Sequence, residues 1–330
     1  MSAPLAHFKA DAQRKAGDLR HRGIIQTAMG KYEVVRDQRK LWFQDWQGAR
    51  NLAARTKFEA VNHLDTHLAE LAKNLEARGT RVHWASNAEQ ARNIILGILK
   101  EKSAKVIVKS KAMTSEEIHL NDAMEKSGYE VVESDLGEYI VQLREEPPYH
   151  LVFPAMHLTR GEIKDLFQKK LNDAPSDDPE ALTMVARRAL RKKYLQADVG
   201  ITGANFAIAE TGGIVICTNE GNADLGVSLP KIHIACMGME KLIPRAADLG
   251  VFLRLLARSA TGQPITTYSS HFHGPQPGHE MHIVIVDNGR TEILNSDFKR
   301  SLDCIRCGAC MNTCPVYRRS GGHSYQSTVP

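Results

Sequence analysis

The first 79 residues carry apolar positions at helical spacing on a polar background. The clearest stretch steps by three and four residues along one helix face, through Val61, Leu64, Leu68, Leu71 and Leu75. Gly79 then supplies a typical helix stop. We therefore expect a helical N-terminal region over residues 1–79.

From residue 80 the pattern changes to short apolar runs that alternate with amphipathic stretches. The runs predict strands over 80–86, 105–110, 129–135 and 149–155, and the stretches predict helices over 87–103, 114–128 and 159–171. Two of these helices open with the sequence of a capping box, Thr114 to Glu117 and Thr159 to Glu162. This alternation predicts an α/β domain, in which a parallel-rich sheet is covered by helices.

The second half of the chain continues the domain to about residue 295. Helices are predicted over 179–196 and 245–262, and buried strands over 212–218 and 231–238. Two further strand-like runs flank Asn288-Gly289, a dipeptide typical of a β-hairpin turn. We expect three regions: helical 1–79, α/β 80–295 and a C-terminal segment 296–330.

Composition and charge narrow the class of protein. The chain has 330 residues, of which 42% are hydrophobic and 25% charged, as in ordinary globular proteins. The net charge of +5 favours anionic ligands or acidic partners, and no nucleic-acid-binding motif accompanies it. No apolar run is long enough to cross a membrane, and the N-terminus lacks the pattern of a secretion signal. We expect a cytoplasmic protein, with membrane association only through partners.

Four of the six cysteines lie close together near the end of the chain, at Cys304, Cys307, Cys310 and Cys314. With Pro315 they form C-x2-C-x2-C-x3-C-P, the spacing by which bacterial ferredoxins bind [4Fe–4S] clusters. A zinc site is the alternative, but zinc sites favour paired C-x2-C units with a separating stretch. We therefore expect these four cysteines to be iron–sulfur ligands in a ferredoxin-type segment.

The fourth cysteine of the motif raises a question of completeness. In two-cluster ferredoxins this cysteine binds the other cluster, and a second motif supplies the missing ligand. This sequence holds no second motif. Either Cys314 completes the same cluster or the chain is a fragment of a longer protein, and we favour the fragment. Cys217 and Cys236 lie in apolar runs and are expected to be buried structural thiols.

Several stretches together resemble a known family. KSKAMTSEEI, DVGITGANFAIAETGGIV, NEGN and the cysteine motif, in this order, are similar to the lactate-utilisation protein B family over about residues 30–325. The resemblance implies a LUD-type α/β domain like that of sugar-phosphate isomerases and CoA-transferases. It also implies two [4Fe–4S] clusters in a full-length chain, electron transport from L-lactate oxidation, and partner subunits. Members continue into a second cysteine motif, which this sequence lacks.

Three loops after predicted strands are candidates for binding a small molecule, since ligands in open α/β sheets bind at the carboxyl ends of strands. The first holds Lys109, Ser110 and Lys111 before a helix N-terminus, which suits a carboxylate or phosphate; a solvated strand end is the alternative. The second and third supply glycines, amides and hydroxyls, at Gly203, Asn205, Thr211, Gly212, Gly213, Asn219, Glu220, Gly221 and Asn222.

Glu210 is the candidate for chemistry within the second loop. A carboxylate there could be a general base or a nucleophile of the CoA-transferase kind, or it could hold the loop by accepting backbone N–H groups. We favour a binding role for the loop. His271 and His273 would share a strand face, but nearby prolines and glycines favour a loop over a second metal site. His157 follows a predicted strand and faces either the pocket or the surface.

Three functions from different classes are compatible with these features. The first is an iron–sulfur electron-transfer subunit of a complex that oxidises L-lactate to pyruvate, without a nicotinamide, since no G-x-G-x-x-G follows a strand. The second is an acyl- or CoA-transferase-like enzyme that uses Glu210 and has a structural cluster. The third is a non-catalytic scaffold; the basic helix end at 186–194 would then dock an acidic partner, or is simply a solvated face.

Overall fold

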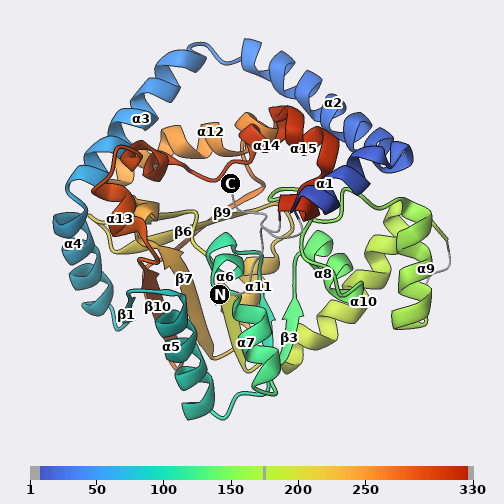
Figure 1. Cartoon of the computed structure of the whole chain (residues 1–330). Coiled ribbons are helices and arrows are strands. Elements are labelled where there is room, and N and C mark those ends of the chain that lie inside the picture. The colour runs from blue at the N-terminus through green and yellow to red at the C-terminus, as the bar shows by residue number, and fades with distance from the viewer. Residues whose placement is uncertain (1–7, 174–175, 326–330) are drawn as a thin grey trace.

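A six-stranded parallel sheet forms the centre of the protein, whose computed structural model describes residues 8–173 and 176–325. Its strands are β1 (Arg81–Ala85), β2 (Val106–Lys109), β3 (Glu130–Glu133), β4 (Val199–Thr202), β7 (Ile232–Gly238) and β10 (Glu280–Val286). They lie in the order β1-β10-β7-β4-β2-β3 (Figure 1). The central strands are buried almost throughout, as expected where both faces are covered. The predicted parallel sheet is confirmed.

The strand order reverses between β2 and β4. After β2 the chain adds β3 on one side, whereas after β4 it adds β7 and then β10 on the other. The loops after β2 and β4 therefore leave the sheet in opposite directions and open a crevice at its carboxyl edge.

A second, four-stranded sheet lies behind the first and was not predicted. It has the order β8 (Leu242–Ile243), β5 (Phe206–Ile208), β6 (Gly213–Thr218) and β9 (Tyr268–Phe272). One face packs on the large sheet through small and branched residues such as Ala207 and Ile214. The other face packs on α12 (Leu249–Thr261), where the rings of Phe206 and Phe252 lie 5.2 Å apart.

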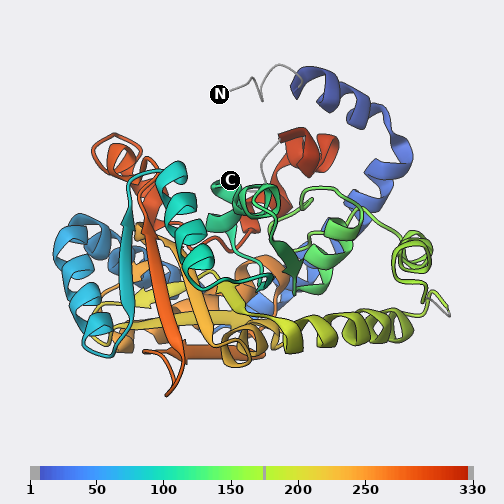
Figure 2. The same cartoon turned by 90° about the horizontal axis from the view of Figure 1, so that it is seen from below.

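Helices cover both sides of this pair of sheets. The free face of the large sheet packs on α5 (Ala88–Glu101), α6 (Met113–Glu117) and α7 (Leu120–Lys126). The leucines of α4 (Leu64–Glu76) enter the core between the sheets. Beyond β3, a separate group forms from α8 (Leu136–Leu143), α9 (Arg160–Leu171) and α10 (Pro179–Gln196) (Figures 1 and 2).

The N-terminal helices pack on the cysteine segment. The N-terminal region forms α1 (Phe8–Gly17), α2 (Leu19–Leu41) and α3 (Trp46–Asn62), as predicted, although α3 and α4 are separate helices. The cysteine segment forms α14 (Ala309–Thr313) and α15 (Pro315–Ser320), and α15 packs on α1 and α2 (Figure 1). Ile25 and Met29 of α2 share a small core with Met311 and Tyr317. The cysteine segment is therefore held by helices from the opposite end of the chain.

The remaining short elements connect these layers. They are α11 (Asn222–Ser228), α13 (Arg290–Leu294) and the 3-10 turns η2 (Met239–Lys241), η3 (Ala246–Asp248), η4 (Lys299–Asp303) and η5 (Gly322–Tyr325). Among the residues that the structure describes, no helix is both long and apolar enough to cross a bilayer.

Strand β4 was not predicted, and His271 lies in strand β9 where a loop was expected. Three further local predictions were wrong, and the hairpin at Asn288-Gly289 is the clearest. Both residues are left-handed, with φ of 47° and 90°, but the chain enters α13 instead of a returning strand. Because β10 is already paired with β1 on one side and β7 on the other, a hairpin partner has no open edge. Asn288 serves the loop instead, since its side-chain oxygen accepts a hydrogen bond from the Ala88 N–H at 3.1 Å.

The other two errors concern residues 149–155 and Thr114. Residues 149–155 form a tight loop, closed by a hydrogen bond from the Tyr149 N–H to the Pro154 carbonyl at 2.8 Å. Thr114 caps nothing, because α6 already begins at Met113, and left-handed His119 separates α6 from α7. The capping box at Thr159 is confirmed, with reciprocal bonds to Glu162 at the start of α9.

Candidate functional site

A cavity of about 480 Å³ lies in the crevice between β2 and β4. The loops after these strands supply Ser110, Lys111, Gly203 and Asn205 to its wall, and the end of β6 supplies Asn219, Glu220 and the start of α11 at Asn222. The loop at 151–156 and helix α12 complete the enclosure. Seven of the residues predicted to bind a small molecule therefore meet in one cavity.

Lys111, Asp135 and Glu220 form a charged group at one end of this cavity. The Lys111 ammonium lies 3.7 Å from the Asp135 carboxylate, and Glu220 accepts a hydrogen bond from the Leu136 N–H at 3.2 Å. Burial lowers the pKa of Lys111, but Asp135 and the other nearby carboxylates outweigh it and leave the pKa above its ordinary value. Burial, reinforced by Asp135, raises the pKa of Glu220 to about 6. Lys111 therefore stays positively charged at neutral pH, next to the Glu220 carboxyl, which titrates at about pH 6.

The amide side chains mainly shape the walls. Asn205 accepts a hydrogen bond from the Cys217 N–H at 2.8 Å and so joins the β4 loop to β6. The side-chain oxygen of Asn219 accepts hydrogen bonds from the Thr267 N–H and from the Gln263 side chain. These bonds hold the loop between α12 and β9 in place. Gly203 lets the two switch-point loops approach, because a Cβ there would lie 2.9 Å from the Cβ of Ala112.

Basic groups and a cysteine form the other end. Lys241, Arg306 and Cys307 all line the cavity, and the last two belong to the cysteine motif. Lys241 is buried, and burial lowers its pKa to about 8 against the opposing effect of Glu240. Arg306 is left-handed, with φ of 56°, and its guanidinium lies 3.4 Å from Glu117. The cavity therefore connects the α/β domain directly to the cysteine motif.

Lys109 does not line the cavity. Its side chain is fully buried, and its ammonium lies 2.7 Å from Glu133 and 3.1 Å from Glu116. Burial acts to lower the pKa of Lys109, but the two carboxylates outweigh it and raise the pKa above its ordinary value. The structure thus gives Lys109 a place in a buried ion-pair network under the loop that carries Lys111.

Residues 210–213 also lie away from the cavity. They form the turn between β5 and β6, whereas the cavity meets the opposite end of this hairpin at Asn205 and Cys217. Glu210 accepts a hydrogen bond from the Ala246 N–H at 2.8 Å. The turn docks on α4, where Asn74 donates to the Ala209 carbonyl. Glu210, Thr211, Gly212 and Gly213 are therefore not brought together with Lys111. Gly221 is left-handed at the start of α11 and lies against the ring of Tyr268.

The cysteine motif follows η4 as a curled loop. Cys304 and Cys310 are exposed, while Cys307 and Cys314 are half-buried. Backbone N–H groups already donate to sulfur, from Arg306 to Cys304 at 3.3 Å and from Tyr317 to Cys314 at 3.5 Å. Burial raises the pKa of Cys307, and neighbouring Cys304 and Cys310 raise it further. Cys310 interacts electrostatically with Cys304 and with Cys314 as well. Neighbouring thiols with N–H donors are a donor set that fits a [4Fe–4S] cluster.

Gly308 allows the motif to lie against the body of the protein. It has φ of 81°, and a Cβ there would lie 2.7 Å from Cγ2 of Val152. Only glycine combines this conformation with so close an approach. The two cysteines outside the motif are ordinary thiols: Cys236 is buried as predicted, while Cys217 is half-buried and lines the cavity.

Sequence reasoning missed several residues of the site. Asp135 follows β3, so the rule that ligands meet the carboxyl ends of strands could have found it. Lys241 lies in a 3-10 turn before the unpredicted second sheet, and no periodic signal marks it. The wall loop at 151–156 overlaps residues 149–155, which the sequence predicted to be a strand, so its place beside the cavity was missed.

Comparison with known proteins defines the family. The LUD domain profile matches residues 68–293. Lactate utilization protein B of Bacillus cytotoxicus is 46% identical over 317 residues, covering 94% of this chain and 66% of the relative. The protein of the same name from Shouchella clausii is 43% identical over 332 residues, covering 98% and 70%. The chain belongs to the lactate utilization protein B family.

As a member of the lactate utilization protein B family, the chain spans about two thirds of the length of the curated relatives it matches. The walls of the cavity at Lys111 and Glu220 lie inside the matched LUD domain, whereas Arg306 and Cys307 lie after it. Among solved structures, a DUF162 family protein from Deinococcus radiodurans aligns with 68% of this chain and 98% of its own, at 14% identity and a TM-score of 0.37.

Proposed function

We propose that this chain is the iron–sulfur electron-transfer subunit of a multi-protein complex that oxidises L-lactate to pyruvate. The observation that carries the proposal is that Cys307 and Arg306 of the cysteine motif line the same cavity as Lys111 and Glu220. The choice of lactate as the substrate rests on the name of the relatives, lactate utilization protein B. The proposal assigns 1–79 to a helical region, 80–295 to an α/β domain of the sugar-phosphate isomerase and CoA-transferase type, and 296–330 to a ferredoxin-type segment.

The charges of the cavity suit a small carboxylate. Lys111 at one end and Lys241 and Arg306 at the other present positive charge to an enclosed volume of about 480 Å³. Ser110 and Asn219 also line the cavity and offer hydrogen bonds of the kind that a 2-hydroxy acid can accept and donate. We infer that the cavity binds the carboxylate that the complex converts, or its product.

The cysteine motif supplies the route for electrons. Cys304, Cys307, Cys310 and Cys314 would hold a [4Fe–4S] cluster, which carries one electron at a time. Oxidation of lactate to pyruvate releases two electrons and two protons, so other subunits of the complex must share the transfer. A full-length chain is expected to hold two such clusters, and Cys314 would bind either this cluster or the second one.

Replacement of Cys307 by Ser tests the proposal. The complex should be assembled anaerobically with its partner subunits, and lactate-dependent dye reduction measured together with iron and sulfide content. We expect C307S to lose iron and most of the activity. C217S is the matched control, because it removes a thiol from the wall of the same cavity without touching the motif. Full activity in an iron-depleted C307S complex would exclude the electron-transfer role.

A variant of Glu210 separates this proposal from the acyl-transfer alternative. We expect E210Q to keep its activity in the lactate-dependent assay, because Glu210 lies in the turn at the far end of the β5–β6 hairpin. A covalent CoA thioester on Glu210, detected by mass spectrometry in the unmodified protein, would instead favour a transferase. Loss of iron with no loss of activity, and no thioester, would favour a docking scaffold.

A further inference from the structure

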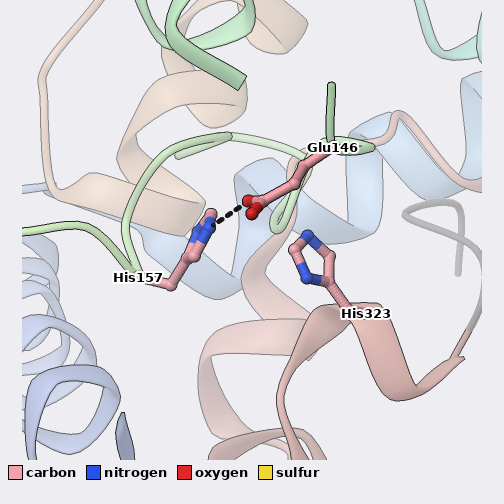
Figure 3. A group of neighbouring side chains, drawn as sticks. All are labelled: Glu146, His157 and His323. Atoms are coloured by element: carbon pink, nitrogen blue, oxygen red, sulfur yellow. Dashed lines mark hydrogen bonds and ion pairs between the residues drawn. The ribbon is translucent and has the colours of Figure 1, made fainter. Parts of the chain in front are cut away.

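Three side chains from separate parts of the chain converge at a point outside the cavity (Figure 3). Glu146 and His157 lie on the segment between α8 and α9, and His323 lies in η5, after the cysteine motif. One potential ligand atom from each residue lies within 4.8 Å of the other two. Two imidazoles and one carboxylate are a donor set that binds Zn²⁺ and related divalent metals.

The spacing of these atoms is close to that of a bound metal. Two ligands at about 2.0–2.2 Å from a tetrahedral Zn²⁺ lie about 3.4 Å from each other. Nε2 of His157 and Oε2 of Glu146 are 3.0 Å apart, so this pair already has nearly the right separation. The ligand atom of His323 lies within 4.8 Å of both, somewhat farther than in a bound metal, so a modest movement of this ring would complete the set.

The hydrogen bonds around the three residues prepare them for a cation. Nε2 of His323 lies 2.9 Å from the Pro147 carbonyl, to which it can only donate, so Nδ1 keeps its lone pair. Metal-binding histidines commonly donate their second ring nitrogen in this way. The other oxygen of Glu146 is bonded by Arg144 at 2.7 Å, which leaves Oε2 for the site.

His157 carries an unexplained polar atom. Its side chain is only 8% exposed, and within the described part of the chain its buried Nδ1 has no hydrogen-bond partner. Because no partner among the described residues holds a proton or a lone pair at Nδ1, the ring proton can lie there and leave the Nε2 lone pair to a cation. The ring of Tyr149 stacks on His157 with centroids 4.7 Å apart and fixes its orientation.

The ionisation states also suit a metal. Burial lowers the pKa of His157 to about 4 and also lowers the pKa of His323, so both rings are neutral at neutral pH. Burial acts to raise the pKa of Glu146, but hydrogen bonds from Arg144 and His157 bring it down to about 2. Neutral imidazoles and an ionised carboxylate are the forms that ligate a cation without first releasing protons.

We propose that Glu146, His157 and His323 bind one divalent cation, with Zn²⁺ as the metal that this donor set favours. The cation fastens the segment after the cysteine motif to the loop between α8 and α9, and joins two histidines that are 166 positions apart in the sequence. Three protein ligands leave a fourth position for water. The site is independent of the function proposed above, because none of its three residues lines the cavity or belongs to the cysteine motif.

Cobalt is a suitable probe, because free cysteines in the motif would bind metal too. Thiolate ligands give Co²⁺ intense charge-transfer absorption in the near ultraviolet, whereas nitrogen and oxygen ligands give only weak visible bands. Full-length chain with its iron–sulfur motif loaded should be titrated anaerobically with Co²⁺, then with Zn²⁺ in competition. We expect one equivalent that lacks the thiolate band and is displaced by Zn²⁺.

The variants H157Q and H323Q should each lower the affinity for this equivalent of Co²⁺ at least about 100-fold. Even a residue that only supports a metal ligand typically contributes 10–100-fold to metal affinity. H271Q is the matched control, because His271 is an exposed histidine beside His273 in another part of the fold. Equal cobalt stoichiometry in the wild type and both variants would overturn the proposal.

A second measurement on the wild type does not depend on the variants' folding. Hydrogen exchange of the backbone amides in η5 should slow several-fold when Zn²⁺ is added, because the metal fixes His323 to the loop that carries Glu146. Exchange of β9, which lies in the second sheet, should not change. Unaltered exchange in η5 at saturating Zn²⁺ would contradict a cation that bridges the two segments.

Discussion

Replacement of Lys109 by Met tests whether the buried ion pairs under the cavity carry stability through charge. Lys109 is fully buried, and its ammonium lies 2.7 Å from Glu133, which is 3% exposed. Glu138, also buried, lies in the same network and leaves one carboxylate oxygen without a partner among the described residues. Methionine fills a similar volume but removes the buried positive charge of Lys109, which opposes the raised pKa of both carboxyls.

The expected loss follows from the burial of the remaining charges. Breaking a buried pair from one side typically costs about 3–5 kcal/mol, because the partner charge stays desolvated. By the usual scaling for domains somewhat smaller than this chain, that cost lowers Tm by about 6–20 °C. An exposed lysine contributes far less, since surface pairs are worth about 0–1 kcal/mol. K105M, at an exposed lysine just before β2, is therefore the matched control.

The pH dependence distinguishes charge from packing. Burial raises the pKa of Glu133 and of Glu138 in the folded protein, and Lys109 opposes this rise. A carboxyl whose folded pKa is raised favours folding at low pH, and this contribution is lost as pH rises through the folded pKa. Without Lys109 both pKa values rise further, so the deficit of K109M should be larger at pH 8 than at pH 5. Denaturant unfolding at the two pH values measures this. A deficit that is equal at both would attribute the loss to packing and refute the electrostatic account.

Three further outcomes test other parts of the structure. Gly308→Ala should lower iron incorporation, because the added methyl group would strike Val152, whereas Gly161→Ala in an open helix position should not; equal iron content in both would contradict the close approach. Thr159→Val should cost about 1 kcal/mol of unfolding free energy through loss of the capping box, and an unchanged denaturation midpoint would argue against it. Binding of pyruvate, measured by calorimetry, should weaken as pH rises through about 6, where Glu220 gains its charge. The Glu220→Gln variant should bind pyruvate with an affinity that no longer changes in this pH range. A pH dependence that persists in the variant would show that another group titrates.

The part of the fold that could be predicted is the part with local signals. Apolar runs between amphipathic helices predicted the strands of the parallel sheet except β4, and the capping box at Thr159 predicted the start of α9. In the second sheet β6 was predicted as a strand, but β5 and β8 have only three and two residues, are buried on both faces and gave no signal. The Asn288-Gly289 turn shows the opposite failure, where a strong local signal was overruled by a strand whose two edges were already paired.

The candidate site was predictable to the same degree. Lys111 follows the predicted strand β2, and Asn205 follows β4, which the sequence analysis missed. Because β2 and β4 are adjacent and parallel, the two residues meet at the same edge of the sheet. Glu210 follows a strand as well, but it lies at the turn of a hairpin whose other end meets the cavity. The end of the β5–β6 hairpin that faces the cavity is determined by how the second sheet packs on the first. No local sequence pattern predicts this packing. The convergence of His157 and His323 likewise depends on the path of the whole chain.

The packing of α2 against α15 sets an order of events during synthesis. Glu33 and Arg318, whose side chains lie 2.6 Å apart, are separated by 285 residues. At about 5–20 residues per second, the ribosome needs about 15–60 s to produce the partner after the N-terminal helices have emerged. During that interval Ile25 and Met29 lack Met311 and Tyr317, although Tyr149 and Leu151 of the same small core are made much earlier. The N-terminal helices therefore complete their packing only after the cysteine segment has been synthesised. Insertion of iron and sulfide has to compete with that packing or precede it.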